Sequence, residues 1–427
     1  MKIILILLLI SSVIVAKDNI SGYFQVYDYI DLTGFLDETN FFTNKHPRES
    51  LFSHDRTGLK LQLRFNGDII EDLYYDVSVN IDYDSKLAQK EPTSNNDDGV
   101  VLSFREGFIV IRDVMGFLDI KVGRQYLFWG GFEWGSALDV ITPWNFNTMS
   151  AEKENFRIAV DMLKLTFNIS DSLTLDTIFI PIAPENRVAI PDKMGTLTQK
   201  DSIHPSKDLL NSEIAFKLTW QAGEETEISL DYFKGFDRNF SIMVDIDNSE
   251  FWAEYRALQV VGLELSTISF NTMWIFEVAY HHTDDKNGDN ISITNRNISS
   301  VFGFEKDITS NLSLSGQISF KKLFDYDRQK EYESFSGIRE DPYVKRTESI
   351  SLLYRLRYIY SPKVSFQILN SIDLRDFNMM LLTFASINPM DKLKLYVGTI
   401  LFKGVEGSRF GRVEEESRFF IELKYLF

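Results

Sequence analysis

The chain has no cysteine among its 427 residues, which excludes disulfide bonds, thiolate metal sites and a cysteine nucleophile. Histidine is scarce too: there are five, His46, His54, His204, His281 and His282, and no serine elbow of the Gly-x-Ser-x-Gly type accompanies them. We therefore predict no catalytic residue and no cofactor, and we expect that the protein is not an enzyme.

Long apolar runs and an excess of positive charge are missing as well. After residue 16 no apolar run reaches the length of about eighteen residues that a membrane-spanning helix needs. Lys and Arg number 45 against 62 Asp and Glu, which gives a formal net charge of −17. Nucleic acid is not an expected partner, because phosphates require a basic surface. Solvated acidic loops account for the charge.

Aromatic side chains, by contrast, are abundant. They make up 14% of the chain, with 35 Phe and 18 Tyr, yet the mean hydropathy is only −0.14. A soluble protein would have to bury these rings in a core. A transmembrane β-barrel displays them to lipid and alternates them with polar residues that face its lumen.

The last twelve residues, 416–427, alternate in this way. One face of an extended strand carries Phe419, Ile421, Leu423, Tyr425 and Phe427, and the other face is charged. The ending resembles the terminal aromatic strand by which Gram-negative outer-membrane β-barrels are recognised for assembly. It therefore predicts the cell outer membrane as the location and the barrel-assembly machinery as a partner, contacted through the strand that ends at Phe427.

The first residues are typical of a secretory signal peptide. Lys2 precedes the aliphatic run 3–10, and Ile14-Val15-Ala16 forms a small-residue cleavage site. The run is too short to span a membrane. We expect residues 1–16 to be a signal peptide and residues 17–427 a single domain; the alternative is a buried N-terminal helix.

Alternating apolar and polar residues predict about 18 strands of roughly membrane-spanning length. In 156–168 the alternation slips near Met162-Leu163, which suggests a bulge. The strands are expected near 20–30, 58–66, 72–84, 100–112, 117–126, 156–168, 172–182, 211–222, 225–236, 255–268, 271–283, 295–307, 311–324, 347–360, 363–375, 378–388, 392–403 and 416–427.

The connections alternate in length. Those after even-numbered strands are short, those after odd-numbered strands are mostly long and polar, and only 376–377 departs from the rule. This pattern predicts an all-β fold: a transmembrane, antiparallel, up-and-down β-barrel with short periplasmic turns and long outer loops. A large soluble β-sandwich or β-helix is the alternative, but nothing there ties loop length to strand order.

The connection 127–155 is more aromatic than a solvated loop should be. Trp129, Trp134 and Trp144 would be costly to leave in water, so the segment should pack against other parts of the protein. We expect it to fold into the lumen as a constriction loop. The alternative is a loop packed on the barrel rim or on a neighbouring subunit.

Three pieces of this region resemble a segment of known proteins. Gly123-Arg124-Gln125, Trp129-Gly130 and the run from Asp139 to Pro143 are similar to uncharacterised outer-membrane proteins of the porin superfamily related to alginate-export channels, and residues 178–181 look like those proteins too. The resemblance implies a channel of about this strand number and no particular solute. An alginate exporter would be expected to have a lumen lined by Arg and Lys, and this chain departs from that.

The side chains predicted to face the lumen carry charges of both signs. Such a set either creates transverse fields across a pore or forms salt bridges that brace the wall. The candidates for pore and constriction residues are Arg124, Glu133, Asp139, Arg355, Arg357 and Asp119.

Metal binding is not expected. The segment 285–290 resembles a calcium loop, but its sixth position is Asn290 and its twelfth is Arg296, where glycine and glutamate belong. Asn287-Gly288 favours a hairpin turn instead. His281 and His282 are adjacent on a strand and so point to opposite faces.

The sequence thus predicts an outer-membrane, porin-like channel for passive diffusion of small or oligomeric solutes. A surface receptor or adhesin with a closed lumen is the alternative, and a barrel enzyme is a third reading. Outer-membrane lipid and lipopolysaccharide are expected partners. The solute, the direction of transport and homo-oligomerisation are left open.

Overall fold

The computed structural model describes residues 20–31, 53–85, 100–145, 150–187, 193–194, 197–245, 248–285, 287–288, 290, 292–336, 347–405, 408 and 410–427. The expected signal peptide lies outside these residues.

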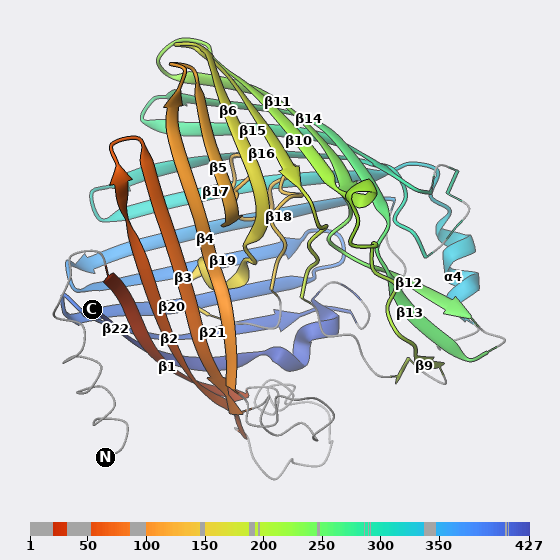
Figure 1. The fold of residues 1–427 in the computed structure, drawn as a ribbon. Coiled ribbons are helices and arrows are strands. Elements are labelled where there is room, and N and C mark those ends of the chain that lie inside the picture. Colours follow the sequence, from red (N-terminus) through yellow and green to blue (C-terminus); the bar gives the residue numbers. More distant parts are fainter. Residues whose placement is uncertain are drawn as a thin grey trace.

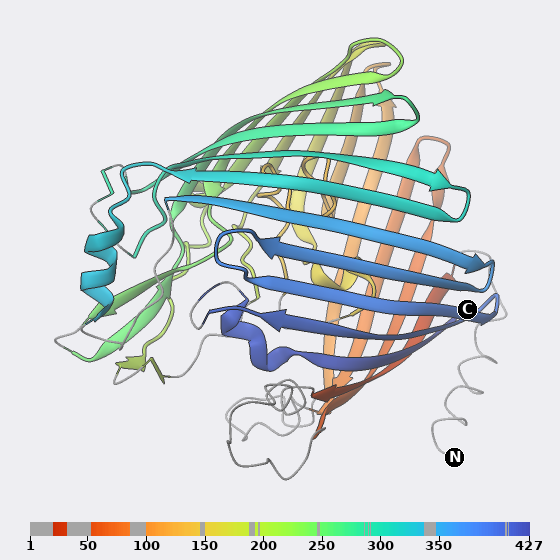
Figure 2. The same ribbon diagram turned by 180° about the vertical axis from the view of Figure 1, so that it is seen from behind.

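Eighteen antiparallel strands form one closed barrel, because the last strand pairs with the first (Figure 1, and from behind Figure 2). Each strand also pairs with its neighbour in the chain, as an up-and-down barrel requires. The strands are β1(Ile20–Asp31), β2(Ser53–Ile70), β3(Leu73–Asp84), β4(Val100–Val114), β5(Leu118–Gln125), β6(Val160–Ser170), β7(Leu173–Ile180), β10(Glu213–Gln221), β11(Thr226–Phe236), β14(Ala257–Ser269), β15(Thr272–Thr283), β16(Asn297–Thr309), β17(Leu312–Leu323), β18(Glu348–Ser361), β19(Val364–Asp373), β20(Met379–Met390), β21(Leu393–Lys403) and β22(Arg418–Leu426).

The two-residue period sorts side chains between the two faces of the barrel wall. In β22, Phe420 is 1% exposed and Glu422 0%, whereas Ile421 and Leu423 are each 41% exposed. The charged residue faces the interior and the aliphatic residues face outward, which is the pattern that a lipid-embedded barrel needs. The predicted strand number and order are confirmed, and the predicted ranges differ from the observed ones by a few residues.

The prediction of a bulge near Met162-Leu163 in the sixth strand is wrong. β5 pairs with β6 without interruption, from Leu118 opposite Phe167 to Gln125 opposite Val160. Val160 and Met162 are buried on the inner face, where they meet apolar residues of the connection that precedes β6. The alternation looked broken because an inward-facing residue here is apolar rather than polar.

A bulge does interrupt β4. Ser78 of β3 lies opposite Glu106 and Val79 lies opposite Phe104, so Arg105 is an extra residue in the ladder. A bulge of this kind re-aims the side chains beside it. Arg105 and Glu106 both line a cavity inside the barrel, although they are consecutive in the chain.

The short connections lie at one end of the barrel, here called the turn end, and the long connections at the other, the loop end (Figure 1). Beyond the loop end lies a small sheet that the sequence did not predict, formed by β8(Lys193–Met194), β9(Leu197–Gln199), β12(Ser241–Asp245) and β13(Glu250–Glu254). The helical segments are η1(Lys153–Phe156), η2(Leu209–Asn211), α4(Arg328–Ser336) and η3(Gly411–Glu416). Among the described residues, no helix combines the length and the apolar character needed to cross a membrane.

Candidate functional site

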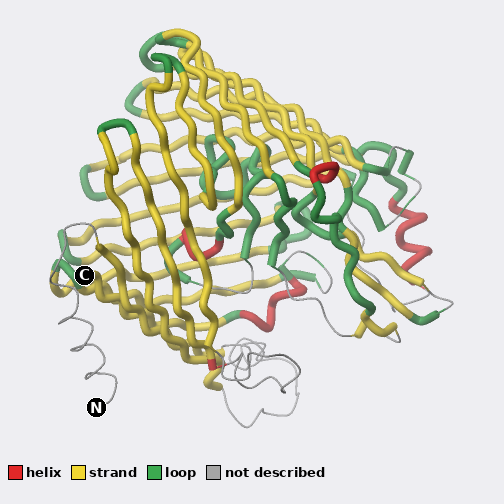
Figure 3. Tube along the Cα trace, in the orientation of Figure 1, coloured by secondary structure: helices red, strands yellow, loops and turns green. Residues whose placement is uncertain are grey.

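The described residues between β5 and β6, 126–145 and 150–159, lie inside the barrel and are called the inner loop below (Figure 3). Irregular backbone is expensive inside a membrane protein unless protein groups satisfy it. The position of this segment is therefore explained by the contacts that it makes with the inner wall.

On one side, the inner loop packs through apolar side chains. Trp129, Phe132, Leu138 and Ile141 are all buried, in a cluster with inward-facing residues of β6, β7, β10, β11, β14, β15 and β16. The wall residues in this cluster are Val160, Met162, Ile178, Ile180, Ala215, Phe233, Leu258, Val260, Ile275, Ala279 and Val301. This half of the wall is therefore covered by the loop.

A buried carboxylate fixes the loop on the same side. Glu277 of β15 is fully buried and accepts hydrogen bonds from Gly131 N at 2.8 Å, Ser136 Oγ at 2.8 Å and Ala137 N at 2.7 Å. Three donors compensate the cost of burying a charge, which one neutral partner would not do. The contact also ties the backbone of the loop to a single strand.

A second buried cluster holds the opposite side of the loop. Trp134, Trp144 and Phe156 pack against residues of β1 and β19–β22, including Tyr29 and Phe420. The rings of Trp134 and Trp144 lie 5.4 Å apart between centroids, and those of Trp134 and Phe156 lie 5.5 Å apart.

Charged side chains of β22 hold the end of the loop. Glu422 accepts from Ser150 Oγ at 3.1 Å and from Ala151 N at 3.2 Å, while Lys424 Nζ lies 2.7 Å from Glu152 Oε2. The loop thus crosses the interior and is attached to both flanks.

A buried arginine that follows β11 connects the loop to the start of β10. Arg238 donates to both carboxylate oxygens of Glu213, at 2.6 and 2.7 Å, and its Nε donates to the Ile141 carbonyl at 3.0 Å. The pair is almost fully buried. Removing one partner would leave an uncompensated charge, so the contact is a strong latch for residue 141.

Asp139 and Arg157 form a second buried pair, within the loop. Burial raises the pKa of Asp139, and the Arg157 guanidinium opposes that rise. Arg157 also donates to the Thr142 carbonyl at 3.0 Å and stacks over the Trp144 ring at 3.5 Å. Asp139 therefore shapes the loop rather than facing open water.

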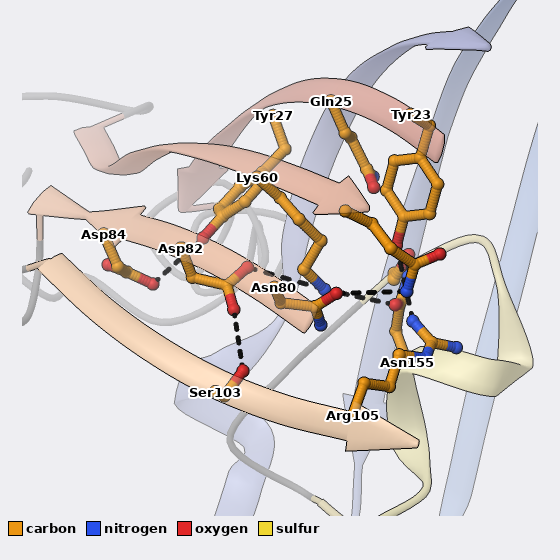
Figure 4. A network of polar contacts seen from close by, with 12 residues as sticks. Tyr23, Gln25, Tyr27, Lys60, Asn80, Asp82, Asp84, Ser103, Arg105 and Asn155 are labelled. Atoms are coloured by element: carbon orange, nitrogen blue, oxygen red, sulfur yellow. Dashed lines mark hydrogen bonds and ion pairs between the residues drawn. The ribbon is translucent and has the colours of Figure 1, made fainter. Parts of the chain in front are cut away.

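Along β2–β4 the loop leaves space. A cavity of about 180 Å³ lies between the beginning of the loop and the wall, lined by Gln62, Arg64, Ser78, Arg105, Glu106, Tyr126 and Phe128. Figure 4 shows the polar network next to it, with Arg105 pointing toward side chains of β1 and β2. This cavity is an open, polar part of the interior; a second, smaller one is lined by Glu133, Glu305 and Arg355 among others.

Ion pairs between strands brace the inner wall. Near the cavity they join β2 to β3, as in Lys60 with Asp82 at 3.8 Å and Arg64 with Asp76. Elsewhere Lys164 of β6 pairs with Asp176 of β7 at 3.0 Å, and Lys217 of β10 reaches across β11 to Glu264 of β14 at 3.0 Å. Many inward-facing charges are thus already paired, as the bracing interpretation expects.

The structure brings together only some of the residues that the sequence singled out. Arg355 of β18 pairs with Glu133 of the inner loop at 2.9 Å and with Glu305 of β16 at 3.6 Å. Trp129, Trp134 and Trp144 are all in the loop clusters. These contacts hold the loop to the wall, and Glu133 and Arg355 also line a second pocket.

The other three candidates lie elsewhere. Arg124 shares a face with the outward-pointing Val122, and its partner is Asp161 at 2.9 Å. Asp119 accepts from the backbone N–H of Asp113 at 2.8 Å, beside the turn after β4. Arg357 is near the turn end of β18. None of the three lines the cavity.

Four cavity residues were missed by sequence reasoning: Arg105, Glu106, Tyr126 and Phe128. The signal for the first two was the consecutive charges in Phe104-Arg105-Glu106-Gly107, which break the alternation and mark the bulge. No comparable signal marks Tyr126 and Phe128, because their position depends on how the loop folds.

The histidine pair divides between the two faces. The ring of His282 lies 6.4 Å from that of Tyr280, on the outward face of β15, while His281 Nε2 lies 3.2 Å from the Ala137 carbonyl inside. No group of three or more potential His, Asp or Glu metal ligands occurs in the described ranges. The segment that resembles a calcium loop lies partly outside the described residues.

The fold has relatives among solved structures. OccK1 (OpdK) of Pseudomonas aeruginosa aligns with a TM-score of 0.53 at 9% identity, over 96% of this chain and 98% of that chain. OccK8 (OprE) of the same organism has a TM-score of 0.52 at 11% identity, with 96% and 97% covered. OccAB4 of Acinetobacter baumannii has a TM-score of 0.51 at 11% identity, with 96% and 99% covered.

These neighbours are Gram-negative outer-membrane porins. At such identities the likeness shows the fold alone. The closed barrel and its apolar outer face are those of an outer-membrane protein. No family model matches the sequence, and no curated protein sequence matches it either.

Proposed function

We propose that the protein is a porin-like channel through which small solutes diffuse passively, with the inner loop as its constriction. One observation carries the proposal: the loop is anchored to both flanks of the wall and leaves a polar cavity along β2–β4. A path lined by protein polar groups lets hydrated solutes cross where lipid would exclude them.

The attachment of the loop supports a constriction of fixed size. Glu277, Glu422 and the Arg238–Glu213 pair each hold a different part of the loop. A loop held at several points keeps its shape while solutes pass. The cavity of about 180 Å³ beside it has the scale of a small solute rather than an oligomeric one.

A surface receptor with a closed lumen is the second candidate. The small sheet β8–β9–β12–β13 beyond the loop end favours it, because an ordered platform there could bind a partner. In this reading the inner loop would act as a plug and no solute would pass.

The remaining expectations belong to the same proposal. Lipid and lipopolysaccharide would contact the outward apolar face, and the assembly machinery would bind the β22 strand that ends at Phe427. The role is not enzymatic. Descent from proteins related to alginate-export channels would fit the resemblance of the inner loop, without making alginate the solute.

Conductance in planar lipid bilayers tests the proposal. Purified protein should give unitary current steps, and the receptor reading predicts none at any salt concentration. The variant Glu277→Ala, with a loosened loop, should give larger or noisier steps than the wild type. Arg124→Ala is the matched control, because Arg124 pairs with Asp161 on the outward face and touches no loop anchor.

A further inference from the structure

The cavity beside the inner loop contains two charged groups of opposite sign that form no short ion pair with another side chain of the described residues. Its lining has three charged residues, Arg64, Arg105 and Glu106. Arg64 is bound through Nε and Nη2 to Asp76. The charges that remain for a solute are therefore one guanidinium and one carboxylate.

The direct side-chain contacts of Arg105 are with neutral groups, while the charges of Glu106 and Glu152 act on it at longer range. Its Nη1 donates to the Tyr23 hydroxyl at 3.4 Å, and its guanidinium lies 5.5 Å from the centroid of the Tyr126 ring. The Gln62 amide oxygen accepts from Nε at 3.3 Å when the amide is turned toward it. In the described part of the chain no carboxylate lies within ion-pairing distance of Arg105.

Glu106 likewise makes no short ion pair, although its charge acts on Arg64, Arg105 and Lys121 at longer range. Its carboxylate accepts from the Tyr126 N–H at 3.5 Å, which is a long hydrogen bond. No basic side chain of the described ranges lies within ion-pairing distance of it. Elsewhere on this wall charges are paired across strands, as Lys164 is with Asp176 at 3.0 Å.

Leaving two charges unpaired in a partly enclosed site is costly unless water or a solute compensates them. The bulge in β4 allows Arg105 and Glu106 to face inward together, and it leaves Arg105 without a partner residue in β3. Bulges of this kind often re-aim side chains at functional sites.

We propose that this cavity is a binding subsite for small zwitterionic solutes of the amino-acid type. The solute carboxylate binds the Arg105 guanidinium, and its ammonium group binds the Glu106 carboxylate. Charge-assisted hydrogen bonds of this kind are about twice as strong as neutral ones. The inference rests on the proposed channel function and gives that channel a solute class.

The size of the cavity agrees with such a solute. A cavity of about 180 Å³ has room for several waters, or for a solute of a few heavy atoms such as alanine. Phe128, which is 50% exposed, and Tyr126 supply an apolar surface for a short side chain.

Uptake into proteoliposomes, above that of protein-free liposomes, tests the subsite with four three-carbon solutes: alanine, lactate, isopropylamine and propane-1,2-diol. Alanine uptake should saturate with concentration, whereas propanediol uptake should rise linearly. Arg105→Gln and Glu106→Gln should each raise the half-saturating alanine concentration about 10-fold, with propanediol flux unchanged.

Arg357→Gln and Glu227→Gln are the matched controls, because both residues face the interior near the turn end and neither lines the cavity. They should leave alanine saturation unchanged. Linear alanine uptake in the wild type, or equal saturation by lactate, would overturn the zwitterion subsite while leaving the channel in place. No uptake of any of the four solutes would overturn the channel itself.

Discussion

The two halves of the inner wall differ in how they meet the inner loop. Beneath Trp129 and Ile141 the loop covers the wall mainly through apolar contacts, whereas along β2–β4 a polar cavity remains between the loop and the wall. Both halves are built from the same alternating strands. The difference lies in the side chains at the inward-facing positions. Many are Ile, Val or Ala where the loop packs against the wall, and charged or amide side chains where the cavity separates the loop from the wall.

Inward-facing residues of this barrel have two separate roles. Apolar ones and fully satisfied carboxylates such as Glu277 hold the loop. Incompletely paired polar ones face the space that the loop leaves. A lumen charge is therefore a candidate solute contact only when the wall and the loop have not already paired it.

Removing the loop should erase the difference between the two halves and have the largest effect. Deletion of residues 130–141, with a short glycine linker, exposes the apolar wall and opens the lumen. Single-channel conductance should rise several-fold, and solutes larger than the cavity should pass. An unchanged conductance would mean that the loop does not limit flow.

Breaking the buried latch should be the next largest change. Arg238→Ala leaves the Glu213 carboxylate buried without its partner, at a cost of about 3–5 kcal/mol. The protein should unfold at lower denaturant concentration, and the open-channel current should become noisier as residue 141 loosens. The double variant Glu213→Gln/Arg238→Gln removes both charges and should recover part of the stability; no recovery would contradict the latch.

The Glu133–Arg355 pair should matter less, because both side chains are partly exposed to the interior. Arg355→Ala should lower the free energy of unfolding by no more than about 1 kcal/mol. Its effect on conductance should become smaller at high salt, because salt screens the pair. Comparing the variant with wild type at low and high salt checks this. A large effect independent of salt would assign Arg355 to the solute path instead.

Arg124→Ala should have the smallest effect of the series. Its side chain pairs with Asp161 on the outward face, away from the cavity. Ion selectivity, measured as the reversal potential across a salt gradient, should stay that of the wild type. A clear shift of the reversal potential toward cation selectivity would indicate that Arg124 faces the pore.

The fold could be predicted from the sequence because the signal for each strand is local. Alternation in segments such as 350–358 and the turn residues after them specify the strands one at a time. The site could not be predicted to the same depth. Residue type was the reason for choosing Arg124, Asp119 and Arg357. The contacts of each side chain depend instead on which face of the wall it lies on and on its position along the strand.

The inward-facing apolar residues show the second limit of sequence reasoning. Val160 and Met162 suggested a bulge because a lumen face was assumed to be polar, and Arg105 was passed over because a real bulge broke the period. The first error has a long-range cause, because whether an inner-wall position is wet depends on the path of the loop. The second is local, because the bulge lies within the β3–β4 ladder.

The central claim is that solutes pass along β2–β4 and not beneath the covered half of the wall. Since the chain has no cysteine, single cysteines can be placed at Phe128, beside the cavity, and at Ala279, beneath the loop. Adding a charged methanethiosulfonate reagent to open channels in a planar bilayer should block current through Phe128→Cys and leave Ala279→Cys unaffected. Block of Ala279→Cys with no effect on Phe128→Cys would contradict the account.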